Sequence, residues 1–506
     1  MNRFNIESVS QALEIFDAMR EKAVSLGHAM GVIYLDSVTN APTNTAAYRA
    51  RTLGTLSGLE YDITTAPEVK AAIAYLVEHQ DELDDSRRRE ITHYDRENKF
   101  VSSIPKEEYA AYSEMIANAE AVWHKAKQDN DFAAFEPYLE QIFESNRRFA
   151  GYFCPEKPAY DVLLDRYENG LTMEKADEFF AGLRTEIVPL LAKVMAAPQV
   201  DDSFLGADYP VEKQRELSDY LMEVMGMDRT HCGIAETEHP FTINFGRDDV
   251  RITTHYHEDN VASSMYSVIH EGGHALYELG VGTEYERTFL SGGISMGIHE
   301  SQSRLFENLI GRSREFIALI FPKLLELFPQ QLAGVDAEMF YKAVNKVEPS
   351  LIRTEADELT YALHVLVRYE LEKAIIGGEL KVKDLPAAWN AKYREYLGVD
   401  VPDDTRGVLQ DSHWSGGSVG YFPSYALGSA YGAQMLESLK KDVDVSAAIA
   451  GGSLSPIVEW LGEHIYRHGC MYDPAWLINN CCGTDFDPSY FVRYLKNKFS
   501  EIYNLK

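Results

Sequence analysis

Apolar residues recur three or four positions apart along most of the first 228 residues, which is the spacing of amphipathic α-helices. The segments with this spacing are also rich in Ala, Leu and Glu, which favour helix formation. They are 8–30, 67–98, 137–153, 171–197 and 210–227. The same pattern resumes after about residue 260 and continues to the C-terminus, interrupted near 401–427 by a segment rich in Gly, Pro and Tyr. The chain is therefore predicted to be mainly α-helical.

A different pattern lies between the two helical parts. Thr242–Phe245 and Val250–Tyr256 alternate apolar and other residues on either side of the turn-like sequence Gly-Arg-Asp-Asp at 246–249. This predicts a β-hairpin, in which Arg251, Thr253, His255 and His257 share one face of the second strand. A short sheet of this kind could pair along its edge with an extended peptide.

The helix predicted over 264–280, "SMYSVIHEGGHALYELG", contains two histidines one turn apart. His270 and His274 fall beside the apolar stripe of this helix, so both imidazoles point in the same direction. Two such imidazoles can bind one tetrahedral Zn²⁺, and Glu271 next to them can take a proton from a metal-bound water. The alternative is an ordinary core helix with two hydrogen-bonded histidines.

Two glycines inside this helix argue against the ordinary core helix. Gly272 and Gly273 each cost roughly 1 kcal/mol in a helix relative to Ala. Their presence suggests that a neighbouring helix or a substrate strand approaches this face closely.

A catalytic zinc site needs a third protein ligand. A second helix is predicted from Gly293 onward, and Glu300 stands 26 positions after His274. His299 competes with Glu300 as the ligand, but neighbours on a helix point about 100° apart, so only one of them can face the metal. We expect Glu300 to be the ligand.

Two further segments carry polar groups that a peptidase could use. The segment 407–425 offers His413, Tyr421 and Tyr425 as hydrogen-bond donors to an oxyanion, although its aromatic residues could equally well form a core. The segment 351–361 is predicted to be helical, with Arg353 and Asp357 spaced for an ion pair.

Composition and charge narrow the class of protein. With 45% hydrophobic and 25% charged residues, the 506-residue chain is typical of a globular protein. Its 48 basic and 79 acidic residues give a net charge of −31, which argues against nucleic-acid binding. No apolar run reaches the roughly 18 residues needed to cross a bilayer, and the first residues lack a basic segment followed by an apolar run, so we expect a protein that is not exported. The five cysteines resemble reduced thiols, so we expect a cytoplasmic protein with no membrane partner. Without repeats or linkers, 1–506 is predicted to form a single unit.

Six motifs occur in a characteristic order. They are H-P-F at 239–241, "DVRIT" at 249–253, "HEGGH" at 270–274, "HESQ" at 299–302, I-R-x-x-A-D-E-L-T-Y at 352–361 and G-x-x-Q-D-x-H-W at 407–414. In this combination, over essentially its whole length, the chain resembles the carboxypeptidase Taq family.

The resemblance implies a cytosolic metallocarboxypeptidase, usually a homodimer, with a mainly α, bilobal fold around a long groove, similar to neurolysin and angiotensin-converting enzyme. A small β-hairpin or sheet would lie at the groove, and the motifs of the active site would span 239–425. One Zn²⁺, with Co²⁺ as a possible substitute, would be bound in each subunit. The substrates would be peptides with a free C-terminal carboxylate, hydrolysed at their last bond with broad specificity.

The resemblance also implies roles for individual residues. It assigns His270, His274 and Glu300 to the metal and Glu271 to general acid and base catalysis. It suggests that Arg353, together with Arg251, holds the substrate carboxylate. His239, Gln410 and His413 would contact the substrate, and Tyr421 or Tyr425 would help to stabilise the oxyanion. Two other functions remain open at this stage: an oligopeptidase that cuts internal bonds, and a zinc-stabilised binding protein without activity.

Overall fold

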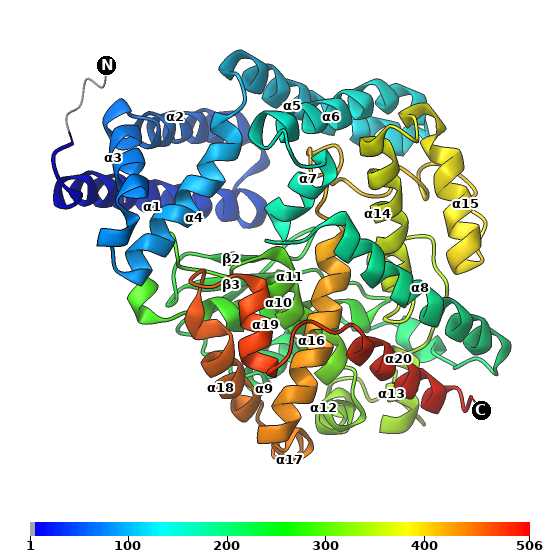
Figure 1. Cartoon of the computed structure of the whole chain (residues 1–506). Helices are drawn as coiled ribbons and strands as arrows, with labels where there is room; N and C mark the ends of the chain where they lie inside the picture. The colour runs from blue at the N-terminus through cyan, green and yellow to red at the C-terminus, as the bar shows by residue number, and fades with distance from the viewer. Residues whose placement is uncertain (1–5, 506) are drawn as a thin grey trace. The chain divides into compact units, whose positions relative to one another are not determined.

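The computed structural model describes residues 6–505, so residues 1–5 and 506 of the predicted unit 1–506 lie outside it. The described chain is mainly α-helical with one small β-sheet, which confirms the predicted fold class (Figure 1). Within residues 6–505, no helix combines the length and the apolar character that a bilayer span requires.

The chain forms two compact units, each assembled from three separate segments. Unit 1 comprises the residues up to 98, 207–294 and 443–473. Unit 2 comprises 99–206, 295–442 and the residues from 474 onward. Each unit is described by itself below.

Unit 1 is built from helices and the only sheet of the described chain. Its helices are α1 (Val9–Thr39), α2 (Ala46–Thr64), α3 (Pro67–Glu78), most of α4 (Asp85–Ser102), α9 (Val211–Val224), α10 (Val261–Leu279), α17 (Val445–Ala450) and α18 (Ser455–His464). Helix α1 packs against α2 and α3 (Figure 1). Phe16 and Met19 of α1 are buried with Ala72 and Leu76 of α3, as the helical spacing of apolar residues predicts.

The regular secondary structure of unit 2 is helical in its described residues. Its helices are α5 (Lys106–Asp129), α6 (Phe132–Phe153), α7 (Ala159–Tyr167), α8 (Met173–Ala196), α11 (Met296–Arg304), α12 (Arg314–Leu327), α13 (Ala337–Val344), α14 (Tyr361–Gly377), α15 (Leu385–Leu397), α16 (Pro423–Asp442), α19 (Pro474–Cys482) and α20 (Ser489–Ile502). Helix α11 packs along α16, and α20 packs against α16 as well (Figure 1).

The predicted hairpin is confirmed in the sheet of unit 1. Strand β2 (Thr242–Asn244) pairs antiparallel with β3 (Val250–Thr254), and Thr242 lies opposite Ile252. A third strand, β1 (Cys232–Glu236), pairs parallel with β3 and was not predicted. The strand order β1-β3-β2 therefore places β3 in the centre and leaves β2 at an edge. Strand β3 ends at Thr254, so the predicted second strand is two residues too long.

The two helices predicted around the histidine motif are confirmed. Helix α10 begins after Asn260, whose side chain caps the backbone N–H of Ser263, and it ends before Gly280. Helix α11 begins after Ser295, whose hydroxyl accepts a hydrogen bond from the N–H of Ile298. A π-helical segment, Leu305–Ile310, continues directly from α11.

The predictions for two other segments need correction. The segment 351–361 is not an α-helix, because only a 3₁₀ turn (Arg353–Glu355) forms before α14 begins at Tyr361. Asp357 accepts hydrogen bonds from the N–H groups of Leu359 and Thr360, so its predicted ion pair with Arg353 is wrong. The glycine-rich loop ends at Phe422, which places Tyr425 in the first turn of α16.

Candidate active site

The predicted site residues are distributed over both units. Unit 1 contains His239, Arg251, His270, Glu271 and His274, and unit 2 contains Glu300, Arg353, Gln410, His413, Tyr421 and Tyr425.

In unit 1, helix α10 presents both histidines of the motif on one face. The ring centroids of His270 and His274 lie 5.0 Å apart, and both side chains are half-buried. Glu271, between them in the sequence, is buried. The hydroxyl of Thr242 on strand β2 donates to Glu271 Oε2 over 2.6 Å. The edge strand of the sheet therefore holds the carboxylate of Glu271 in position.

The close packing expected at the two glycines is present at Gly272. A Cβ atom there would lie 2.7 Å from Met225 Cε and 2.9 Å from Met227 Cε. The element that approaches this glycine is therefore the segment that follows α9, and neither a substrate strand nor the helix of Glu300 is needed to explain it.

In unit 2, Glu300 is buried on helix α11 and its side chain is held by neighbours on the same helix. Arg304 Nε donates to Glu300 Oε1 over 2.7 Å, and the guanidinium of Arg304 stacks on the ring of Tyr361 at 4.1 Å. His299, the competing ligand, is half-buried.

Helix α16 supports the backbone at Glu300. A Cβ atom on Gly428 would lie 2.6 Å from Glu300 Cβ, and one on Gly432 would lie 3.1 Å from the carbonyl oxygen of Ser301. The two glycines, one turn apart, allow α11 and α16 to pack backbone to backbone at this point.

A buried cluster of charges surrounds Arg353, whose side chain is only 7% exposed. Arg353 Nε donates to Asp411 Oδ1 over 2.9 Å, and Arg353 Nη1 donates to the hydroxyl of Tyr361 over 3.0 Å. Arg368, fully buried in α14, donates to Asp411 Oδ2 over 2.7 Å. Two guanidinium groups and one carboxylate leave this cluster with one positive charge in excess.

Gln410 connects this cluster to the backbone. Its Oε1 accepts hydrogen bonds from the backbone N–H of Arg353 over 2.9 Å and from Arg368 Nη2 over 2.7 Å. Its Nε2 donates to the carbonyl oxygen of Leu351 over 2.9 Å. Gln410 therefore positions Arg353, whether or not it also contacts a substrate as predicted.

His413 and the two tyrosines lie together near the start of α16. His413 Nε2 is 3.1 Å from the hydroxyl of Tyr425, and the rings of Tyr421 and Tyr425 are 5.1 Å apart. Within residues 6–505, the buried Nδ1 of His413 has no hydrogen-bond partner. Burial lowers the pKa of His413 to about 4 and raises the pKa of Tyr421 to about 12. At neutral pH these side chains are therefore uncharged hydrogen-bonding groups.

Two predicted substrate contacts lie on or near the sheet of unit 1. Arg251 on β3 forms a bidentate ion pair with Asp249, with both N–O distances at 2.7 Å, and stacks on Phe245 at 4.9 Å. His239 is exposed just before β2. The charge of Arg251 is therefore balanced by its neighbour, unlike that of the Arg353 cluster.

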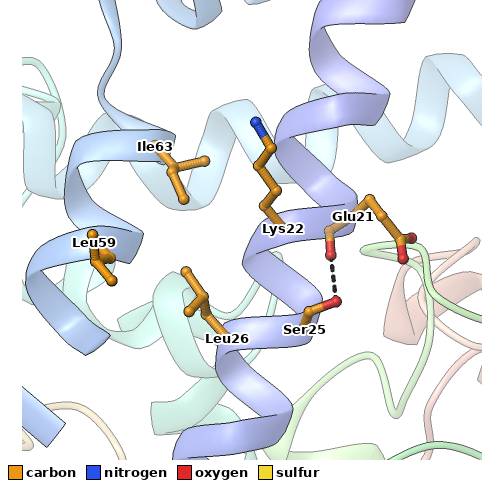
Figure 2. Close-up of a pocket in the computed structure, with 6 residues that line it drawn as sticks. All are labelled: Glu21, Lys22, Ser25, Leu26, Leu59 and Ile63. Carbon is orange, nitrogen blue, oxygen red and sulfur yellow. Dashed lines mark hydrogen bonds between the residues drawn. The ribbon is translucent and has the colours of Figure 1, made fainter. Parts of the chain in front are cut away.

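A shallow apolar hollow of about 330 Å³ lies between α1 and α2 of unit 1 (Figure 2). It is lined by Glu21, Lys22, Ser25, Leu26, Leu59 and Ile63. None of the predicted site residues is among them, so this hollow is not part of the candidate active site.

Several residues that build the site were not predicted from the sequence. Asp411 stands inside the motif at 407–414 but had no assigned role. Arg368 could have been noticed in the sequence, because it is a single arginine within the largely apolar sequence of α14. Thr242 carried no signal, because its contact with Glu271 depends on the packing of β2 against α10.

Comparison with known proteins identifies the class of enzyme and the protein family to which this chain belongs. Residues 15–499 match the carboxypeptidase Taq (M32) metallopeptidases. Carboxypeptidase 1 of Bacillus subtilis (strain 168) is 40% identical over 97% of this chain and 98% of its own length. Thermostable carboxypeptidase 1 of Pyrococcus furiosus is 36% identical over 98% of this chain and 99% of its own length. An M32 carboxypeptidase structure from Deinococcus radiodurans R1 has a TM-score of 0.94 at 35% identity, covering 97% of this chain and 99% of that one.

These matches define the protein as a metallocarboxypeptidase, a peptide hydrolase. The chain belongs to the carboxypeptidase Taq (M32) family, which confirms the resemblance drawn from the six motifs. The alternative of a binding protein without activity is therefore set aside.

Proposed function

We propose that this protein removes single residues from the C-terminus of peptides that carry a free carboxylate, with broad tolerance for the residue removed. The observation that carries this proposal is the buried Arg353 cluster with its single excess positive charge. A charge buried in this way is costly unless an anion balances it, and the terminal carboxylate of a peptide supplies one.

We propose that His270, His274 and Glu300 bind one divalent metal ion. Each offers one ligand atom, and two imidazole nitrogens with one carboxylate oxygen are the donors of a common catalytic zinc site. The residues present therefore fit the metal that the family implies, which we take to be Zn²⁺, with Co²⁺ as a substitute. When bound, such an ion lowers the pKa of a water molecule and polarises the scissile carbonyl.

Glu271 is the proposed general base and acid. Its carboxylate takes the proton from the attacking water and then delivers it to the amine that leaves. The hydrogen bond from Thr242 to Oε2 supports this role, because it restricts the rotation of the carboxylate.

Arg353 is the proposed clamp for the substrate carboxylate. A guanidinium can donate two parallel hydrogen bonds to a carboxylate, which fixes the position of the last peptide bond. A peptide segment that passes through the site without a terminal carboxylate would leave the charge of the cluster unbalanced. This favours a carboxypeptidase over an oligopeptidase that cuts internal bonds.

His413, with Tyr421 or Tyr425, is proposed to donate hydrogen bonds to the oxyanion of the tetrahedral intermediate. Uncharged donors held in fixed positions stabilise developing negative charge without the need to reorganise. Arg251, His239 and Gln410 remain proposed substrate contacts, and a cytoplasmic homodimer remains our expectation from the family.

The test compares a peptide with a free C-terminus and the same peptide with a C-terminal amide. We expect the metal-loaded enzyme to shorten the free acid one residue at a time, and to cleave the amide at least about 100-fold more slowly, since a buried charge pair is lost. Mass spectrometry of the products over time provides the measurement. Equal rates, or internal fragments from both peptides, would contradict the carboxylate clamp and favour the oligopeptidase.

A further inference from the structure

The loop that carries His413 is attached at both of its ends to one side chain, Glu372 of α14. The indole Nε1 of Trp414 donates to Glu372 Oε1 over 2.7 Å. The backbone N–H of Gly420 donates to Glu372 Oε2 over 2.9 Å. Trp414 directly follows His413, and Gly420 directly precedes Tyr421. The carboxyl group of Glu372 therefore binds the residues next to two of the proposed oxyanion donors, His413 and Tyr421.

The loop is also pressed against α7 near its second attachment. Gly420 adopts a φ of +92°, and a Cβ atom there would lie 2.8 Å from the carbonyl carbon and oxygen of Leu163. Helix α7 also contacts Glu372 directly, because the hydroxyl of Tyr160 on α7 donates to Glu372 Oε2 over 2.8 Å. Only a glycine can occupy this position, and the backbone before Tyr421 is therefore held between α7 and α14.

The surroundings of Glu372 require an acceptor on both of its oxygens. The side chain is completely buried, and burial raises its pKa to about 7. The indole of Trp414 and the amide of Gly420 can only donate hydrogen bonds. A carboxyl group can accept from both, whereas the amide of a glutamine would place an NH₂ group against one of these donors.

We propose that Glu372 is a positioning residue for catalysis, which holds the 413–421 loop so that His413 and Tyr425 meet at the oxyanion. The 3.1 Å contact between His413 Nε2 and the hydroxyl of Tyr425 joins this loop to the start of α16. This contact is kept only if both the loop and the start of α16 stay in position. This inference rests on the proposed role of His413 in the reaction.

Loss of the Glu372 hydrogen bonds is expected to lower kcat more than it changes KM. The substrate clamp, Arg353, is held by Asp411 and Tyr361, which lie outside the segment between Trp414 and Gly420. Release of the loop therefore displaces the oxyanion donors more than the clamp. The loss of one oxyanion donor costs roughly 100-fold or more in kcat, and a misplaced donor costs a part of this.

The experiment uses the metal-loaded full chain and the variant Glu372→Gln. We expect kcat for a free-acid peptide to fall about tenfold or more, with KM changed by less than about threefold. Hydrogen exchange followed by mass spectrometry is expected to be faster in peptides that cover 413–422. An unchanged kcat together with faster exchange in this loop would overturn the proposal, and so would an unchanged exchange rate.

Glu90→Gln in unit 1 is the matched control. Glu90 is also a buried carboxylate, which accepts hydrogen bonds from Arg20, Arg87 and the backbone N–H of Phe289. We expect this variant to lower the unfolding temperature and to leave kcat and the exchange of 413–422 unchanged. A similar fall in kcat in the control would show that the loss in Glu372→Gln comes from general destabilisation, and would overturn the proposal.

The variants His413→Ala and His413→Ala with Glu372→Gln separate this inference from the function on which it rests. If His413→Ala retains full kcat, the proposed role of His413 fails. If His413→Ala loses activity, Glu372→Gln is expected to add little further loss in that background, because both changes remove the same interaction. Fully additive losses would show that Glu372 acts independently of His413 and would overturn its positioning role.

Discussion

Burial and neighbouring charges together decide which of the candidate side chains carry a charge. His413 has a pKa lowered to about 4 by burial, so its imidazole is neutral at pH 7. For Asp411, burial alone would raise the pKa, but the guanidinium groups of Arg368 and Arg353 outweigh it and hold the pKa below its usual range. The result is a cluster with one net positive charge for the substrate carboxylate, and uncharged donors for the oxyanion.

Glu271 allows a direct test at the residue scale. Glu271→Gln keeps the shape of the side chain and can still accept the hydrogen bond from Thr242, but it cannot take a proton. We expect kcat to fall by about 100-fold to 10,000-fold, with the metal content unchanged. Steady-state kinetics and elemental analysis of the same sample provide the measurements. Full activity with metal bound would show that another group acts as the base.

At the scale of helices, the position of Glu300 depends on how closely α11 and α16 approach. Gly428 and Gly432 lie at the contact, where Gly428 faces Cβ and Cγ of Glu300 and Gly432 faces the carbonyl oxygen of Ser301. Arg304 and Ser303 on α11 hydrogen bond to the Glu300 carboxylate from the same helix. Residues of α11 therefore orient the carboxylate of Glu300, the proposed metal ligand, and the packing of α16 against α11 sets the position of its backbone.

Gly428→Ala tests this packing. The new Cβ atom would meet the backbone-proximal atoms of Glu300 at 2.6 Å, so the helices must move apart. We expect a loss of about 1–3 kcal/mol in the free energy of unfolding, and weaker metal binding in a competition titration with a chelator.

Gly182→Ala in α8 is the control for this variant. Gly182 is exposed, and no atom lies within 4 Å of the site where its Cβ would be added. This change is expected to stabilise the helix by up to about 1 kcal/mol without an effect on metal affinity. Equal metal affinity in wild type and Gly428→Ala would show that the contact does not position Glu300.

At the scale of the whole molecule, burial raises the pKa of two carboxyl groups in a strongly acidic chain. The net charge is −31, and two carboxyl groups of unit 2, Glu168 and Glu372, are fully buried with pKa values raised to about 7 by that burial. Glu168 accepts hydrogen bonds from the N–H of Gly297 over 2.9 Å and from the hydroxyl of Tyr431 over 3.1 Å. It thereby ties the start of α11 to α16.

The raised pKa of Glu168 makes stability depend on pH. Because its pKa of about 7 in the folded chain exceeds the ordinary value of 4.5 for a glutamate, the stability that this group contributes is complete below about pH 4.5 and is lost as the pH rises through 7. Between pH 5 and pH 8 this loss amounts to about 2–3 kcal/mol. For a chain of this size it corresponds to a few degrees in unfolding temperature, on the order of 2–3 °C.

Glu168→Gln removes this titration. We expect the unfolding temperature of the wild type to fall more steeply from pH 5 to pH 8 than that of the variant, measured by scanning calorimetry at constant metal concentration. Parallel curves for the two proteins would contradict the assigned ionisation, whatever the constant offset between them.

The sequence by itself determined the local elements and the family. The spacing of apolar residues placed helix α10 around His270 and His274, because one helical face is enough to produce that pattern. The hairpin of β2 and β3 was predictable for a similar reason, since its strands are neighbours in the chain and are joined by a short turn. Six ordered motifs identified the family, because their residue types and order are specific even when their contacts are unknown.

Only the tertiary structure decided how distant residues support one another. Strand β1 escaped prediction because its parallel pairing with β3 joins segments that a hairpin turn does not connect. Arg353 looked like the partner of Asp357 in a helix, but the chain is not helical there, and Asp411, 58 positions away, binds it instead. The links from Glu372 to the His413 loop and from Gly428 to Glu300 likewise join residues far apart in sequence. Such contacts arise when elements pack, so residue spacing along the chain does not reveal them.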